Sequence, residues 1–164
     1  MLRLVKANIK YENEILKFRE EMMVSVNRIP GSAGLEAAES VQQWLAGEYT
    51  PHYGKVREAV FLALDEEDRV VGISDIRLES NDFIKQFAGQ IGYSVSPSER
   101  GKGYATEILK QTVEEARKLG MEHILVTCNE SNIASSRVIE KAGGSLESVI
   151  PHPGYPNVKR YRFE

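Results

Sequence analysis

A glycine-rich turn at Arg100–Ala105 constrains this chain more than any other stretch. It follows an apolar run, Gln90–Val95, with the composition of a strand, and it precedes a long amphipathic segment that ends near Gly120. Glycines let the backbone approach a ligand closely, and the first N–H groups of a helix have no partner within the helix. Those N–H groups, the positive end of the helix dipole and the side chains of Arg100 and Lys102 together favour an anion. We therefore predict that the turn binds a pyrophosphate.

The overall composition is that of an ordinary globular protein. The 164 residues fit one domain, 1–164, with 41% apolar and 27% charged residues. The net charge of −3 argues against binding to nucleic acid or to a membrane surface, because both need a basic excess. The one cysteine, Cys128, excludes an internal disulfide and fits the reducing cytosol. Met1–Lys6 is too short and charged for a signal peptide, and no apolar run is long enough to span a membrane, so we expect a cytoplasmic protein.

Hydrophobic spacing divides the first half of the chain into strands and helices. Tyr11–Val26 carries apolar residues three to four positions apart, which is the spacing of one helix face. A polar turn, Asp65–Asp68, separates two runs of strand-forming residues, which predicts a hairpin. The expected elements are a strand at Leu2–Val5, helices at Tyr11–Val26 and Leu35–Ala46, a loop at Ile29–Gly34 between them, and strands at Arg57–Leu64 and Val70–Leu78.

The second half predicts a strand–helix–strand unit followed by a helix and two strands. Asn132 is a good N-cap and Gly120 a good helix stop, while Asn81–Phe87 is compatible with a short helical turn. The strand–helix–strand unit implies a parallel pair with a right-handed crossover, whereas hairpins are antiparallel. We predict an α/β (α+β) fold: a single mixed, mainly antiparallel sheet with a central parallel pair, flanked by helices. The expected strands are Gln90–Val95, His123–Cys128, Gly144–Ile150 and Val158–Phe163, and the helices are Tyr104–Leu119 and Asn132–Lys141.

Three phosphate-binding motifs can be compared with the turn. A P-loop needs a glycine five residues before its Gly-Lys and a hydroxyl residue after the lysine, but Ser96 and Gly103 occupy these positions. A dinucleotide fingerprint needs a third glycine where Thr106 stands, which disfavours a nicotinamide enzyme. The pattern Arg/Gln-x-x-Gly-x-Gly/Ala fits Arg100–Ala105 at every position. As a bare pattern it also describes a tight turn with solvated charges, and the strand and helix around it favour the ligand-binding interpretation.

The sequence from about Ala59 to Phe163 resembles the GNAT superfamily of acetyl-CoA-dependent N-acetyltransferases. The resemblance rests on two sequence elements. The first is Ile91–Val95 followed by Arg100–Ala105, and the second is Cys128–Ser136 with Val138–Gly143. The wording around Gly92–Arg100 is similar to a subgroup described only as predicted acetyltransferases. Two such elements in this order are more specific than either alone.

The resemblance implies acetyl-CoA as co-substrate and no metal. The turn binds the CoA pyrophosphate, and the second element supports the pantetheine arm. The strand before the turn parts from the next strand, and the pantetheine lies in that opening, where a backbone N–H meets the thioester carbonyl. The residues implied to bind the cofactor are Ser94, Val95, Ser96, Arg100, Gly101, Lys102, Gly103, Tyr104, Ala105, Thr106, Asn132 and Ser135.

The resemblance also implies that an acceptor amine attacks the thioester directly. Many members protonate the leaving thiolate with a Tyr seven residues after the Asn, but Ile139 stands here. A branch resembling ribosomal-protein N-terminal acetyltransferases has a Ser three residues after the Asn, and Ser135 matches it. Ser135 is thus the candidate general acid, although a Ser early in a helix is often only a capping residue. Asn132 is expected both to cap its helix and to contact the pantetheine.

The base that deprotonates the amine is less defined. Tyr93, Glu79 and Asp75 are candidates, of which we name Tyr93 and Glu79 as catalytic residues. Strand alternation puts Asp75, Arg77 and Glu79 on one face, which we expect to face solvent rather than line the acceptor channel. Cys128 is expected in the core, because direct transfer needs no covalent acyl-enzyme.

The acceptor pocket is expected from the two N-terminal helices, the loop Ile29–Gly34 and the closing segment Pro151–Arg162. Aromatic candidates for its lining are Trp44, Tyr49 and Tyr53. His52, His123 and His152 show no metal-ligand spacing. The acceptor is a small-molecule amine or a protein or peptide N-terminus. Because Ile139 replaces the usual tyrosine, a non-catalytic acetyl-CoA sensor or interaction module is the alternative function. Because the final strands of such domains often pair across subunits, the resemblance also allows a homodimer.

Overall fold

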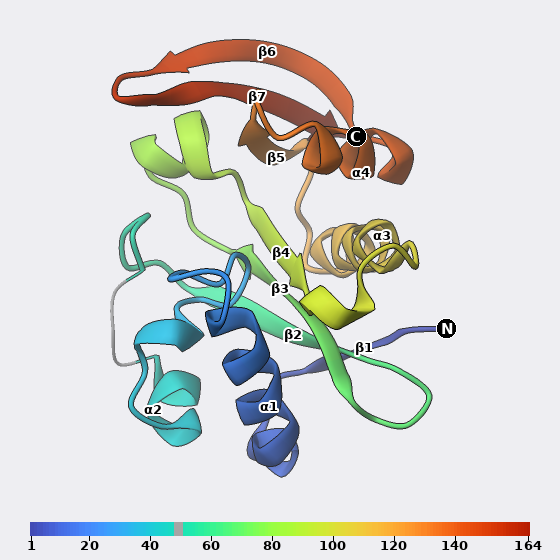
Figure 1. Ribbon diagram of the computed structural model, residues 1–164. Coiled ribbons are helices and arrows are strands. Elements are labelled where there is room, and N and C mark those ends of the chain that lie inside the picture. The colour runs from blue at the N-terminus through green and yellow to red at the C-terminus, as the bar shows by residue number, and fades with distance from the viewer. Residues whose placement is uncertain (48–50) are drawn as a thin grey trace.

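The fold contains two antiparallel sheets with helices packed on their faces (Figure 1). The computed structural model describes residues 1–47 and 51–164, so Tyr49 lies outside the described residues. The first sheet has the strand order β1-β2-β3-β4 and the second has the order β5-β7-β6. The first sheet is built from β1 (Arg3–Lys6), β2 (Glu58–Leu64), β3 (Val70–Arg77) and β4 (Ile91–Val95), and the second from β5 (Ile124–Asn129), β6 (Ser145–His152) and β7 (Tyr155–Phe163).

The two sheets meet at Gln90, just before β4. Its N–H donates to the carbonyl of Leu125 (2.7 Å), while its own carbonyl accepts from the N–H of Arg77 on β3 (2.8 Å). The Gln90 side chain accepts from the N–H of Leu125 (2.9 Å). β5 then follows β7, in a register that runs from Ile124–Phe163 to Asn129–Val158. The expected mixed class is confirmed. The single sheet is wrong in one respect: among the described residues the strand β4 joins β5 only at this point, and β5 pairs along its length with β7 on its other edge.

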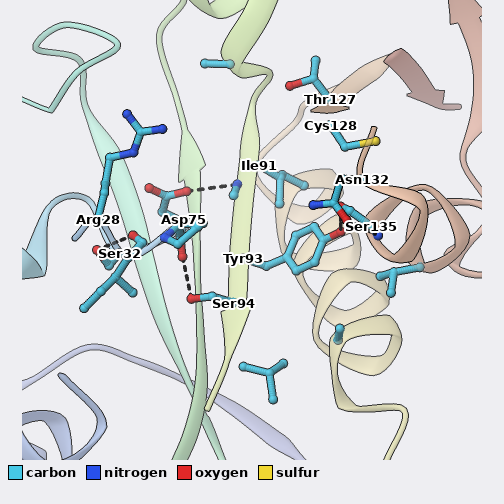
Figure 2. A pocket seen from close by; sticks show the side chains of 18 of the residues that line it. Arg28, Ser32, Asp75, Ile91, Tyr93, Ser94, Thr127, Cys128, Asn132 and Ser135 are labelled. Atoms are coloured by element: carbon cyan, nitrogen blue, oxygen red, sulfur yellow. Dashed lines mark hydrogen bonds between the residues drawn. The ribbon is translucent and has the colours of Figure 1, made fainter. Parts of the chain in front are cut away.

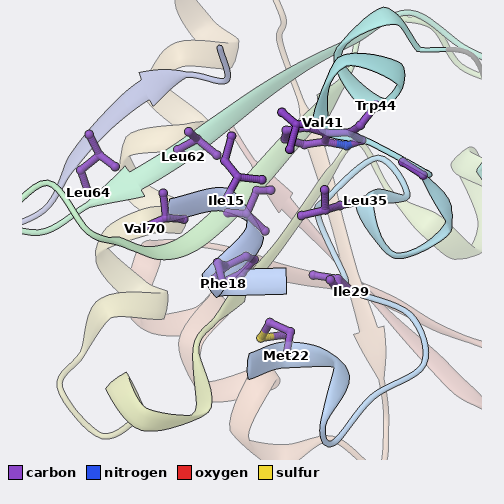
Figure 3. Packing of buried hydrophobic residues seen from close by; sticks show 12 residues of the cluster. Ile15, Phe18, Met22, Ile29, Leu35, Val41, Trp44, Leu62, Leu64 and Val70 are labelled. Atoms are coloured by element: carbon purple, nitrogen blue, oxygen red, sulfur yellow. The ribbon is translucent and has the colours of Figure 1, made fainter. Parts of the chain in front are cut away.

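Among the described residues, four α-helices pack on the sheets. Helix α1 (Glu12–Met23) packs with α2 (Val41–Ala46) on one face of the first sheet. Figure 3 shows this cluster, in which Ile15, Phe18 and Met22 of α1 pack with Leu62, Leu64 and Val70. Helix α3 (Tyr104–Lys118) packs on the other face with α4 (Ile133–Ala142). Leu109 and Val113 of α3 share a cluster with Ile91 of β4 and Val126 of β5, so α3 bridges the two sheets.

The predicted helix Leu35–Ala46 is broken in the middle. A 3₁₀ turn covers Leu35–Ala37, Ala38 is extended (φ −77°, ψ 142°), and α2 starts after Ser40, whose side chain accepts from the N–H of Gln43. The Arg19 guanidinium explains the break. It donates to the carbonyls of Leu35 (3.0 Å) and Glu36 (2.9 Å), which a continuous helix would offer to its own N–H groups four residues later.

The other predicted helices are confirmed close to their expected bounds. Helix α3 ends before Gly120, which is left-handed (φ 88°), and Asn132 accepts from the N–H of Ser135 as the N-cap of α4. The ambiguous Asn81–Phe87 segment is a π-helical turn at Ile84–Ala88, capped by the Asn81 side chain. Within the described ranges, no helix combines the length and apolar character that a membrane span needs.

Candidate functional site

A cavity of about 1100 Å³ extends across β4 between the two layers of helices. Figure 2 shows its two ends: Arg28, Ser32 and Asp75 lie on one side of β4, and Cys128, Asn132 and Ser135 lie on the other. The second end continues to the glycine-rich turn at the start of α3. We call the end near Arg28, His52, Tyr53 and Asp75 the acceptor end, and the end near the turn, β5 and α4 the phosphate end.

The turn presents backbone N–H groups to the phosphate end. Gly101 and Gly103 adopt left-handed conformations (φ 82° and 80°), and apart from the adjacent residues no described atom lies within 4 Å of a Cβ added at either position. Glycine is therefore required there by the backbone conformation and not by crowding. Gly103 is the N-cap of α3 and provides no side-chain cap, so the first N–H groups of the helix are left for a ligand.

Most of the residues expected to bind the cofactor line the cavity, and two do not. Ser96 is buried, with its N–H donated to the carbonyl of Val71 (2.8 Å), and Lys102 pairs with Glu99. Two cations that the sequence analysis missed, Arg137 and Lys141 of α4, line the phosphate end. The two are four residues apart on α4, which places them on one helix face. The lining residues that were expected are Ser94, Val95, Arg100, Gly101, Gly103, Tyr104, Ala105, Thr106, Asn132 and Ser135.

Alternate residues of β4 point their backbone N–H and carbonyl groups into the opening between β4 and β5. The N–H of Ser96 donates to Val71 and that of Arg77 to Gln90, so the even-numbered residues of β4 face β3. The N–H and carbonyl groups of Tyr93 and Val95 therefore point toward β5. We therefore expect the backbone contacts predicted near Ser94–Ser96 to come from Tyr93 and Val95.

The hydroxyl groups of Tyr93 and Ser135 are hydrogen-bonded across the cavity (2.8 Å; Figure 2). Burial raises the pKa of Tyr93 to about 12, so its hydroxyl keeps its proton at neutral pH. Asn132 binds the backbone N–H of Ser135 (3.1 Å), which leaves the Ser135 side chain free for Tyr93. Ile139, at the position of the expected tyrosine, is fully buried in the core. Structure alone thus brings two candidate catalytic residues together from β4 and α4.

The expectation that Asp75 and Arg77 face solvent is wrong. Asp75 is 0% and Arg77 5% exposed, and both line the cavity. Asp75 accepts from the N–H groups of Gly92 (3.0 Å) and Ala33 (3.2 Å) and from the Tyr53 hydroxyl (3.1 Å), and it pairs with Arg77 (3.3 Å). The sequence could not reveal this, because the covering groups come from loops far away in the chain.

Glu79, the other acidic candidate, lies outside the cavity. It follows the end of β3, where its carboxylate accepts from the N–H of Arg57 (2.6 Å) and its side chain is 49% exposed. Glu79 lies two residues beyond the end of β3 and faces solvent, whereas Asp75 lies within the strand and is covered by a loop.

The loop Ile29–Gly34 lies directly against β4, and this explains why Asp75 is buried. A Cβ added at Gly31 (φ 75°) would stand 2.4 Å from the backbone nitrogen of Tyr93, so only glycine permits this approach. The Ser94 hydroxyl donates to the Pro30 carbonyl (2.7 Å), and the Trp44 indole N–H donates to the Ser32 carbonyl (2.7 Å). Trp44 therefore supports the loop from the core and does not line the cavity, whereas Tyr53 does.

Beneath the acceptor end, the Tyr53 hydroxyl lies between the carboxyl groups of Glu58 and Asp75, and two protons connect the three groups. The Tyr53 hydroxyl contacts both carboxyl groups, yet it has only one proton to donate. Since Asp75 is bound by N–H groups and by Arg77, the second proton belongs on Glu58. Burial, followed by the charge of Asp75, raises the pKa of Glu58 to about 8, in agreement with this count.

We predict that Glu58→Gln flattens the dependence of stability on pH. Native Glu58 holds its proton up to about pH 8, whereas the unfolded chain releases it near pH 4.5, so rising pH destabilises the wild type between these values. The difference of about 3.5 pKa units corresponds to a loss of roughly 5 kcal/mol, and the glutamine amide keeps the donor to Tyr53 without titrating. Urea unfolding of both proteins at pH 5, 7 and 9 measures the effect. The same decline in both proteins would contradict the assignment of the proton.

Two of the histidines, His52 and His152, occupy different environments. His52 lines the acceptor end, where desolvation, followed by the charges of Arg28 and Arg77, lowers its pKa to about 4. His152 of the closing segment stacks on Phe87 (ring centroids 3.9 Å apart) and on Tyr155 (4.5 Å). Phe87, and not the closing segment itself, lines the cavity. In the part of the chain that the structure describes, no group of His, Cys, Asp and Glu is arranged to hold a metal ion.

Comparison with known proteins agrees with this geometry. The family model described as acetyltransferase (GNAT) domain matches residues 2–145. A curated relative, the uncharacterized N-acetyltransferase YnaD of Bacillus subtilis (strain 168), is 28% identical over 93 residues. That match covers 54% of this chain and 52% of the relative, so it spans about half the relative's length.

Solved structures share the fold over nearly the whole chain. An acetyltransferase of the GNAT family from Streptococcus pneumoniae superposes with a TM-score of 0.69 at 15% identity, covering 99% of both chains. The spermidine N-acetyltransferase from Vibrio cholerae, in complex with CoA and spermine, superposes with a TM-score of 0.65 at 17% identity. That superposition covers 99% of this chain and 94% of the other. At these identities the superpositions establish the fold.

Proposed function

We propose that this chain, which belongs to the acetyltransferase (GNAT) family, is an acetyl-CoA-dependent N-acetyltransferase acting by direct transfer to an acceptor amine. One observation carries the proposal: the open N-terminus of α3 and the gap between β4 and β5 belong to the same cavity as the Tyr93–Ser135 hydroxyl pair. A single elongated ligand can therefore reach an anion site and a pair of proton donors at once.

The phosphate end fits a CoA pyrophosphate. The open glycine positions at 101 and 103 allow phosphate oxygens to approach the backbone, and the uncapped N–H groups of α3 supply donors. Arg100, Arg137 and Lys141 add positive charge around the same end. Bound acetyl-CoA supplies the activated acetyl group, and the N–H groups of Tyr93 and Val95 are the donors best placed for its backbone-binding arm and carbonyl.

The Tyr93–Ser135 pair supports a catalytic protein over a sensor, although Ile139 is no proton donor. A thiol has an ordinary pKa of about 8.5. Full transfer of the Tyr93 proton, with its pKa of about 12, is therefore uphill by roughly 5 kcal/mol. We assign Tyr93 a hydrogen bond to the departing sulfur, with Ser135 orienting or sharing that bond. Donating to a developing thiolate stabilises the transition state without requiring a free proton.

We predict that Tyr93→Phe lowers kcat by about 10- to 100-fold, the range expected for a hydrogen bond to a charged group. Ser135→Ala lowers kcat less, because Tyr93 keeps its hydroxyl, and both variants retain acetyl-CoA affinity. Release of free thiol measures turnover, and thermal stabilisation by acetyl-CoA measures binding. Tyr11→Phe, which removes a hydroxyl outside the cavity, is the matched control. Unchanged rates in both cavity variants would remove the pair from the mechanism.

Two measurements test the proposed activity. Acetyl-CoA and CoA are expected to raise the melting temperature and NAD is not, because only a ligand that binds the folded state stabilises it. Thiol release across a panel of primary amines then distinguishes a transferase from a non-catalytic sensor. Stabilisation by NAD but not by CoA rejects the acetyltransferase, and binding without release in the whole panel supports the sensor.

Our proposal for the cellular context is a cytoplasmic protein of one domain, 1–164, that binds neither nucleic acid nor membrane. The net charge of −3 and the lone Cys128 support it. A homodimer through β6 and β7 is part of the same proposal, since β6 is paired only on its β7 side among the described strands. Sedimentation at several concentrations tests the dimer.

A further inference from the structure

We infer that the acceptor is a small amine that also carries a carboxylate, and that Arg28 is the residue that recognises this carboxylate. The inference rests on the proposed acetyl transfer and names the substrate class of the same cavity. It differs from what the polyamine in the Vibrio cholerae complex would suggest, because a polyamine is a polycation and needs accessible acidic groups.

The acidic groups of the acceptor end are already occupied. Asp75 is 0% exposed, and its two oxygens are bound by Gly92, Ala33, Tyr53 and Arg77. Glu58 holds a proton and does not line the cavity. These carboxyl groups therefore offer no free oxygen to an incoming ammonium group.

Glu36, the remaining acidic residue described at this end, binds its own loop. Its carboxylate accepts from the N–H of Ile29 (2.6 Å). Burial raises the pKa of Glu36, with the Ile29 hydrogen bond and Arg28 opposing that effect. A desolvated carboxylate that already holds a backbone group is a poor second site for a polyamine.

Arg28 is the charge of this end that is left over. Among residues 1–47 and 51–164 its guanidinium has no hydrogen-bond or ion-pair partner, although it lines the cavity and is exposed. Figure 2 shows it on the same side of β4 as Ser32 and Asp75. Burial is the main cause that lowers the pKa of the neighbouring His52 to about 4, and the charge of Arg28 adds to it, so this ring is uncharged at neutral pH.

Arg77 cannot take the same role. Its Nη1 donates to the carbonyls of Ala88 and Gly89 (both 3.1 Å), its Nη2 pairs with Asp75, and its guanidinium lies over the Tyr53 ring (4.2 Å). Of the two arginines described at this end, Arg28 is the one that can present the planar donor pair that a carboxylate binds bidentately. The apolar surfaces of Pro51, Phe87 and Ala88 complete this end and leave room for an apolar side group.

The test uses L-amino acids, each paired with its amide and its decarboxylated amine, together with spermidine. The amide keeps the amino group but loses the carboxylate charge. We expect kcat/KM for the preferred amino acid to exceed that for its amide by about tenfold, as for one lost charge-assisted bond. Arg28→Ala is expected to erase this preference by lowering only the rate with the acid, and Arg28→Lys to restore part of it. Arg28→Glu is expected to favour spermidine.

Arg57→Ala is the matched control, because its side chain is 74% exposed and outside the cavity. A wild-type preference for spermidine or for the amides overturns the inference, as does an Arg28→Ala effect of equal size on acid and amide. Either result leaves the acetyltransferase standing, since thiol is still released. If no amine releases thiol, or acetyl-CoA does not stabilise the fold, the proposed function fails and the inference fails with it.

Discussion

Gly103→Glu is expected to abolish the stabilisation of the fold by acetyl-CoA while leaving the protein folded without ligand. The position is open: apart from the adjacent residues, no described atom lies within 4 Å of an added Cβ, so the substitution begins without a clash. The left-handed backbone (φ 80°) makes a non-glycine residue cost about 1–2 kcal/mol. The carboxylate, by contrast, is placed at the start of α3, where the phosphate would lie. Repulsion and exclusion together predict at least a roughly 100-fold loss of affinity.

Gly120→Glu separates the backbone strain from the lost site. Gly120 has a similar conformation (φ 88°), has equally open surroundings and follows the other end of α3, outside the cavity. Both variants are expected to melt at a similarly lowered temperature, but only Gly120→Glu responds to acetyl-CoA. Retained binding in Gly103→Glu would show that the turn is not the pyrophosphate site.

Asp75→Ala is expected to destabilise the fold by about 3–5 kcal/mol, the cost of removing one partner from a buried ion pair. The substitution leaves Arg77, which is 5% exposed, without its closest anion, and it frees the N–H groups of Gly92 and Ala33 and the Tyr53 hydroxyl from this carboxylate. Glu58 then ionises more easily, because the charge of Asp75 is one cause of its raised pKa. This partial compensation puts the expected loss at the lower end of the range.

Glu114→Ala is the control for an ion pair in solvent. Glu114 pairs with Arg117 on α3 and its side chain is 62% exposed, so its removal is expected to cost less than about 1 kcal/mol. Urea unfolding at pH 7 measures both variants. If Asp75→Ala costs no more than Glu114→Ala, the cluster beneath the acceptor end contributes nothing to the fold.

Local patterns were sufficient for most of the fold. Helix α3 follows from a continuous apolar stripe that ends at a left-handed glycine, and α4 from its Asn132 cap. The prediction failed where a distant group took over a backbone carbonyl: Arg19 interrupts the helix predicted at Leu35–Ala46. A periodic pattern cannot register a competitor that is far away in the sequence.

The site divides in the same way. The turn at Arg100–Ala105 lines the cavity as expected except at Lys102, because its geometry depends on neighbouring glycines. The charged residues of β3 were placed wrongly in solvent, because alternation tells which residues share a face but not what covers that face. The loop that covers Asp75 approaches through Gly31, whose contact with Tyr93 spans two distant segments.

By itself, the sequence determined the elements whose causes are local: the glycine turn, the helix that follows it, and the capped helix α4. From these elements the sequence determined the class of fold and the expected acetyl donor, acetyl-CoA. Only the tertiary structure decided which side chains share the cavity, namely Tyr93 with Ser135 and Arg28 with a fully occupied Asp75. The physical reason is that turns and caps are set by neighbours along the chain. Burial, ion pairing and proton sharing are set by neighbours in space.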